Sequence, residues 1–189
     1  YKLDVVFTPV PLRDTVDAAY YPAPAFKRTG VGQFYVTPTG NDPNALRQHA
    51  RSAIASLAAH EGFPGHDWYY QFLRSRSSEV SPVRWLTPGG VEDSDSMWAD
   101  SMSCEGWALY CEQLVGEARP GFPDGFYTPE ERLFQLQNQL LRDARVVIDT
   151  GIHCGFLSFD DAVAYLAKNV LFVTGAVSTD PKLNASATE

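Results

Sequence analysis

The chain has 189 residues, of which 44% are hydrophobic and 20% charged, a composition typical of a globular protein that can bury a sizeable core. Its net charge of −8 argues against a nucleic-acid partner. No apolar run approaches the ~18 residues that a membrane-spanning helix needs, so we expect no span in this chain. We detect no internal repeat and expect residues 1–189 to form a single domain.

Neither the first residue nor the cysteines fix the compartment. The chain begins at Tyr1 rather than methionine, which leaves room for a removed leader. Cys104, Cys111 and Cys154 are sparse and odd in number, so we interpret them as free, mostly buried thiols. We expect a soluble protein that is cytoplasmic or, after leader removal, periplasmic or secreted. The oligomeric state stays open.

Two short segments predict strands of a small sheet. Residues 2–8 are β-rich and are closed by Pro9, and residues 32–37 form a second β-rich run that ends before Pro38. We predict that the second run lies at a sheet edge. It is either a plain edge or one that pairs with an extended peptide, with Tyr35 lining the substrate cleft.

The remaining patterns are helical and predict a mainly α protein with a small β-sheet (α+β). Asp42 and Pro43 predict the N-cap and first residue of a helix. Apolar residues then recur at spacings of three and four, and Glu61 continues this stripe. Residues 75–93 are polar and rich in glycine and proline, which indicates either a functional lid or a surface excursion. The predicted helices span 42–61, 67–73, about 94–116, 129–151 and 158–172.

The stretch from His60 to His66, His-Glu-Gly-Phe-Pro-Gly-His, carries the residue types of a hydrolytic zinc site. On a straight helix the two histidines would lie ~9 Å apart along the axis and about 120° apart around it. Two ligands of one zinc ion must come much closer, within ~3.5 Å. Pro64 and its flanking glycines predict a kink that brings His66 back to His60. The alternative is a proline-glycine helix stop with two unrelated histidines.

Glu105 is a carboxylate among apolar residues on a predicted helix, on the same face as Met102, Leu109 and Glu112. A buried carboxylate needs a pairing cation or a metal. The alternatives are an ion pair with an arginine from elsewhere and a third ligand beside His60 and His66.

The long helix after Thr128 carries Arg142 and Arg145, with His153 just beyond its end and Asp149 four residues earlier. In a tight turn Asp149 could orient the ring of His153. The plain alternatives are a surface arginine face and a histidine stabilised by the helix dipole.

These motifs together resemble the large bacterial domain-of-unknown-function family 885. The resemblance rests on residues 60–66, on Glu-Gly-Trp-Ala-Leu-Tyr at 105–110, on Arg-Asp-Ala-Arg at 142–145 and on Asp-Thr-Gly-Ile-His at 149–153. Tyr20-Tyr21-Pro22 and residues 32–35 also look like the upstream part of that family. Family members usually have a second histidine after the first motif, where this chain has Asp67. They are also longer, so this chain resembles the catalytic portion of a larger metallopeptidase-like domain.

The resemblance implies a gluzincin-like zinc metallopeptidase fold. Carried onto this sequence, it makes His60, His66 and Glu105 the zinc ligands and Glu61 the general base. His153, Tyr110, Arg142 or Arg145 would then stabilise the oxyanion or bind the substrate, a peptide or a small amide.

We therefore expect a zinc-dependent hydrolase that cleaves peptide bonds with a metal-activated water. Two alternatives stay open. One is a non-catalytic, zinc-stabilised or metal-free helical module that binds a partner, and the other is a zinc hydrolase of non-peptide amides.

Overall fold

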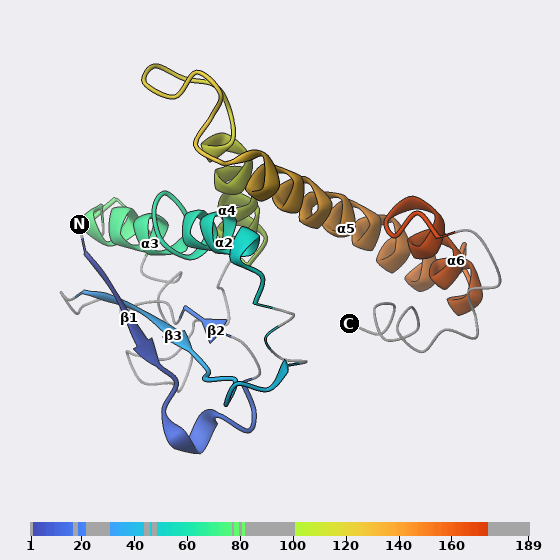
Figure 1. Cartoon of the computed structure of the whole chain (residues 1–189), viewed down its shortest axis with the longest axis horizontal. Coiled ribbons are helices and arrows are strands. Elements are labelled where there is room, and N and C mark those ends of the chain that lie inside the picture. Colours follow the sequence, from blue (N-terminus) through green and yellow to red (C-terminus); the bar gives the residue numbers. More distant parts are fainter. Residues whose placement is uncertain are drawn as a thin grey trace. The chain divides into compact units, whose positions relative to one another are not determined.

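The computed structural model describes residues 2–16, 19–21, 31–43, 46, 49–76, 78–79, 81 and 101–173. These residues form helices and one small three-stranded sheet, so the α+β fold class is confirmed. The chain divides into two compact units, Tyr1–Glu131 and Arg132–Glu189. The first unit holds the sheet and helices α2, α3 and α4 (Figure 1).

The sheet has the order β1-β3-β2, with β1 at Leu3–Phe7, β2 at Ala19–Tyr20 and β3 at Gly32–Val36. Both predicted strands are present, but the prediction that residues 32–37 form an edge is wrong. Strand β3 is central, because it pairs in parallel with β1 and antiparallel with β2. A short 3-10 helix, η1 (Val10–Leu12), follows β1.

The predicted helix over residues 42–61 is interrupted before the histidine motif. Ala50 is extended, with φ −61° and ψ 137°, and only after it do a 3-10 turn, η2 (Arg51–Ala53), and α2 (Ile54–Glu61) begin. The predicted apolar stripe is also not the buried face. Ile54 and Leu57 are 61% and 41% exposed, whereas Ser56, Ala59 and His60 are buried.

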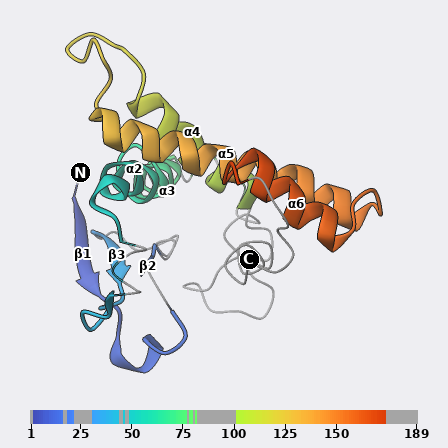
Figure 2. The same ribbon diagram turned by 45° about the vertical axis from the view of Figure 1, so that its right-hand side comes forward.

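Helices α3 (His66–Ser75) and α4 (Ser101–Val115) complete the helical layer of the first unit. Trp68 of α3 stacks on Trp107 of α4, with ring centroids 5.5 Å apart. Figures 1 and 2 show the sheet on one side of α2 and α3. The predicted loop at 75–93 and the predicted start of α4 at 94–96 lie largely outside the described residues.

The second unit contains most of α5 (Pro129–His153) and all of α6 (Phe159–Asn169). A capping box starts each of these helices, formed by Thr128 with Glu131 in α5 and by Ser158 with Asp161 in α6. Helix α5 continues to His153, so the predicted end at Gly151 is wrong. The core of this unit consists of Ala144, Ile148, Ala162, Leu166 and Val170.

Two further predictions concern the chain as a whole. Among the described residues no helix is long and apolar enough to cross a membrane. None of the three cysteines forms a disulfide, but only Cys111 is buried and Cys154 is exposed, so the expectation of mostly buried thiols is wrong.

Candidate metal centre

The segment between the two histidines leaves helical geometry, as the sequence predicts. Helix α2 ends at Glu61, Gly62 has φ −100° and ψ −113°, and α3 begins at His66. The break brings the rings of His60 and His66 to a centroid distance of 4.7 Å at 89°. A straight helix would hold them apart by ~9 Å of rise alone.

Glycine at position 65 makes this close return of the chain feasible. A Cβ on Gly65 would clash with the main-chain carbonyl oxygens of Ala59 and His60. The turn is further held from α4, because Trp107 Nε1 donates to the carbonyl oxygen of Pro64 at 2.8 Å. The backbone conformation of this turn therefore depends on glycine at position 65 and on the hydrogen bond from the Trp107 indole.

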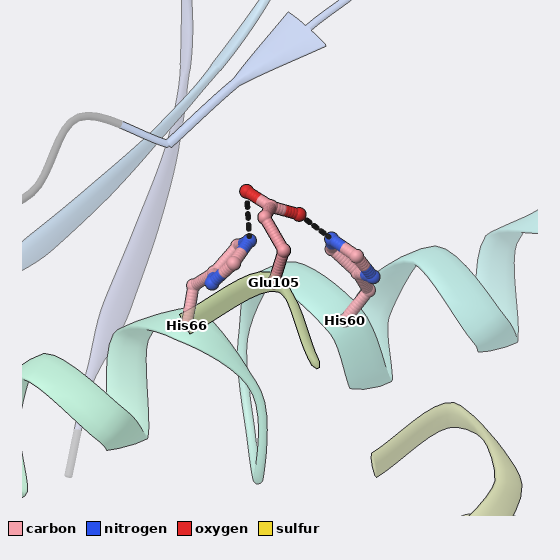
Figure 3. A group of neighbouring side chains, drawn as sticks. All are labelled: His60, His66 and Glu105. Atoms are coloured by element: carbon pink, nitrogen blue, oxygen red, sulfur yellow. Dashed lines mark ion pairs between the residues drawn. The ribbon is translucent and has the colours of Figure 1, made fainter. Parts of the chain in front are cut away.

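Three side chains from three helices converge at this turn (Figure 3). Nε2 of His60 lies 3.5 Å from Oε2 of Glu105, and Nε2 of His66 lies 3.4 Å from Oε1 of the same carboxylate. One ligand atom from each residue lies within 4.8 Å of the other two. The structure thus brings together the three residues for which the sequence predicts a shared role.

Two of the separations, one from each histidine to a carboxylate oxygen of Glu105, are close to those between ligands of one zinc ion. Ligands at about 2.0–2.1 Å from a tetrahedral zinc lie about 3.3–3.4 Å from each other, close to both carboxylate–imidazole distances. Two imidazoles and one carboxylate are also a donor set found in catalytic zinc sites.

Glu105 is not buried, contrary to the sequence expectation. Its side chain is 58% exposed, whereas those of His60 and His66 are 11% and 9% exposed. Residues that neighbour Glu105 in sequence are apolar, but Met102 on the same helix is itself exposed. The described partners of Glu105 are the two histidines, not an arginine.

The buried carboxylate on α4 is Glu112, to which the sequence analysis gives no role. It is 3% exposed, and its Oε1 lies 2.7 Å from Nδ1 of His60. The signal in the sequence is its position seven residues after Glu105, two helical turns along the same face.

The charges of the cluster shift the ionisation of its members. Burial alone would lower the pKa of His60, but its contacts with Glu105 and Glu112 outweigh burial and raise that pKa to about 9. Contacts with His60 and His66 hold the pKa of Glu105 well below its ordinary value. Burial raises the pKa of Glu61, although the charges of the two histidines lower it.

Asp67, directly after His66 at the start of α3, faces the sheet. It is fully buried and accepts a 2.6 Å hydrogen bond from the hydroxyl of Tyr21. A Cβ on Gly32 would clash with the Asp67 carboxylate, so β3 approaches α3 closely here. Asp67 therefore ties the sheet to the first turn of α3, directly beside His66.

The other predicted site residues are not members of this cluster, and their roles stay predictions. Tyr35 stacks on Tyr20 at a centroid distance of 4.9 Å, and the half-exposed Tyr110 packs beside Trp107. Three more belong to α5 in the second unit: Arg142, Arg145 and His153. Nδ1 of His153 lies 2.8 Å from the main-chain oxygen of Asp149 and 3.4 Å from its Oδ1, and both side chains are 75% exposed.

The structure thus has a cluster of two histidines and a glutamate at a helix break. Residues 1–180 match the sequence profile of the family described as "Bacterial protein of unknown function (DUF885)", and the chain belongs to this family. No curated protein matches it significantly.

One similar solved structure is the crystal structure of "the putative lipoprotein from Colwellia psychrerythraea". It has a TM-score of 0.65 and 24% identity over 99% of this chain, a likeness that extends to the fold alone. This chain spans 28% of the length of that protein.

Proposed function

We propose that this protein is a zinc-dependent hydrolase that cleaves peptide bonds, with a gluzincin-like metal centre. The observation that carries the proposal is the convergence of His60, His66 and Glu105, whose ligand atoms lie within 4.8 Å of one another. These residues would hold the ion. Zinc in such a site acts as a Lewis acid and lowers the pKa of a water molecule to about 7.

The exposure of Glu105 favours a catalytic site over a structural one. Structural zinc sites are closed by four protein ligands, whereas catalytic sites have three and keep one position open. The described cluster has three candidate ligands, and one of them is 58% exposed to solvent. A substrate could therefore approach from the side of Glu105.

Glu61 supplies the base in this proposal. It follows His60 directly at the end of α2 and is close enough to both histidines for their charges to affect its pKa. Burial raises that pKa, which moves the carboxylate toward the range in which a group can both accept and return a proton near neutral pH. Glu61 would accept a proton from the attacking water and deliver it to the leaving amine.

The test combines metal analysis with a single substitution. We expect the purified protein to contain zinc and to cleave members of a mixed peptide library, and we expect a chelator to abolish cleavage without unfolding. Glu61→Gln should retain zinc and fold and lose at least ~10²-fold in rate, because the amide keeps the shape without the basicity.

Three results would count against the proposal. They are a protein without zinc affinity, a Glu61→Gln variant with more than about a tenth of the wild-type rate, and zinc that is needed for folding yet supports no turnover. The last result would favour a zinc-stabilised binding module. Cleavage confined to small non-peptide amides would change the substrate class but keep the site.

A further inference from the structure

We propose that Glu112 is a positioning residue, which fixes the tautomer and ring orientation of His60 that zinc binding requires. This inference rests on the zinc site proposed above.

The two ring nitrogens of His60 face different carboxylates at different distances. Nδ1 lies 2.7 Å from Oε1 of Glu112, the length of a charge-assisted hydrogen bond. Nε2 lies 3.5 Å from Oε2 of Glu105, beyond a normal hydrogen bond and suited to two ligands of one ion. When His60 is neutral, the shorter contact places the proton on Nδ1, and the lone pair of Nε2 then faces Glu105.

Burial makes the contact between Glu112 and His60 costly to lose. Both residues are at most 9% exposed, and a buried N–H group that loses its acceptor loses the free energy of the hydrogen bond without regaining one to water. The hydroxyl of Tyr127 donates to the main-chain oxygen of Glu112 at 2.8 Å, which anchors this turn of α4. This bond is made to the main chain, and helix α4 itself carries the Glu112 side chain to His60, so we assign Tyr127 a role in stability rather than in orienting the carboxylate.

His66 lacks an equivalent partner within the described part of the chain. Its Nδ1 is buried and has no hydrogen bond there. The two histidines are thus held by different means, and a change at Glu112 should act on the metal through His60.

A purely structural reading of the same contact makes different predictions. If Glu112 and His60 form only a buried ion pair, loss of Glu112 lowers the stability of the metal-free protein and does not weaken zinc binding. If Glu112 positions His60, its loss weakens zinc binding in a protein that is still folded. Loss of such an outer partner typically weakens metal affinity 10–100-fold.

The experiment measures zinc affinity at one pH by competition with a chromophoric chelator, for wild type, Glu112→Gln and Glu112→Leu. Glutamine keeps the shape and an acceptor oxygen but loses the charge, and we expect roughly tenfold weaker binding. Leucine removes the acceptor, and we expect a loss approaching 100-fold. Circular dichroism checks that each variant is folded, and glutamine decides the question if the leucine variant does not fold.

Two measurements separate positioning from stability. Tyr127→Phe removes a hydrogen bond to the main chain of Glu112 but leaves its carboxylate, so it should lower the melting temperature without changing zinc affinity. In the cobalt-loaded protein, the exchangeable Nδ1 proton of His60 should give a paramagnetically shifted resonance. That resonance should broaden or vanish in Glu112→Leu, because the proton then lacks its carboxylate acceptor and exchanges faster with water.

The outcomes distinguish this inference from the function on which it rests. If wild type binds zinc and both folded Glu112 variants bind it equally well, the positioning role is overturned and the zinc site stands. If wild type binds no zinc, both proposals fail. Weaker binding in the two variants, with wild-type affinity in Tyr127→Phe, supports the positioning role.

Discussion

Helices α2 and α6 differ in the side chains that they bury, because only α2 buries polar residues. The buried residues of α6 are apolar and follow helical spacing: Ala162, Val163, Leu166 and Ala167. In α2 the buried residues are Ser56, Ala59 and His60, while Ile54 is 61% exposed. The buried face of α6 packs in an apolar core. The buried face of α2 instead carries His60, whose ring contacts His66 of α3 and the carboxylates of α4.

This difference implies that substitutions can change metal binding and the free energy of unfolding separately. Substitutions at the end of α2 and at its partners should affect metal binding more than folding. Substitutions in the core of the second unit should do the opposite. Each prediction below tests that separation, from the largest expected effect to the smallest.

Glu105→Ala should have the largest effect, on zinc affinity. It removes one of three proposed ligands, so the loss should exceed the 10–100-fold expected for an outer partner. Secondary structure should survive, because the side chain is mostly exposed. Isothermal titration or chelator competition measures the affinity. Glu117→Ala, at an exposed glutamate just beyond α4, is the matched control and should bind zinc normally. A Glu105→Ala protein with wild-type affinity would remove Glu105 from the site.

Leu166→Ala should act on stability alone. Leu166 is 3% exposed in the core of the second unit, and truncation of a buried leucine costs about 2–5 kcal/mol. Urea unfolding followed by circular dichroism measures the loss. Zinc affinity, measured in buffer where the variant is still folded, should equal that of wild type. A parallel loss of zinc affinity would show that the two regions are coupled.

The pH should move the stability of the metal-free protein and its zinc affinity in opposite directions. The pKa of His60 is raised from 6.5 to about 9, so its contribution to stability is complete below pH 6.5 and is lost as the pH rises through 9. The pKa of Glu105 is lowered from 4.5, so its contribution is lost as the pH falls below that value. The second contribution should be small, because solvent screens this mostly exposed carboxylate.

The cluster therefore stabilises the metal-free fold most between about pH 4.5 and 6.5. Zinc needs a neutral imidazole, so zinc affinity should rise with pH across the range from 6.5 to 9. Melting curves with chelator and affinity titrations, each over this pH range, check the two slopes. Slopes of the same sign would argue against His60 as a ligand.

The sequence predicts the fold well wherever a local rule decides it. The capping boxes at Thr128 and Ser158 mark the starts of α5 and α6, and Pro64 with its flanking glycines marks the break in the histidine motif. These signals lie within a few residues of the structure they cause.

Sequence patterns do not predict features that depend on contacts between residues far apart in the chain. Strand β3 is central because the two-residue β2 pairs with it, and two residues carry no readable pattern. Glu105 is exposed and Glu112 buried although both lie on one predicted face. Which carboxylate is buried depends on where α2 crosses α4, and helical spacing does not contain that information.

Gly65→Ala should have a moderate effect on stability that extends to the metal. The added methyl group would meet the carbonyl oxygens of Ala59 and His60, which are backbone atoms and cannot swing away. Overpacking of this kind costs about 1–3 kcal/mol. Because His60 and His66 flank the displaced turn, zinc affinity should fall together with the melting temperature. Unchanged values of both would mean that the turn is looser than described.

Gly106→Ala is the matched control and has the smallest expected effect, of opposite sign. Gly106 lies in α4 directly after Glu105 and is exposed, and in the described part of the chain no atom beyond its sequence neighbours lies within 4 Å of an added Cβ. Alanine in a helix interior is favoured over glycine by about 0.5–1 kcal/mol, so the variant should melt slightly higher. Its zinc affinity should equal that of wild type, because the methyl group touches neither histidine nor Glu105. A loss of affinity here would mean that the backbone of α4 moves when zinc binds, and that Glu105 reaches the metal only with that movement.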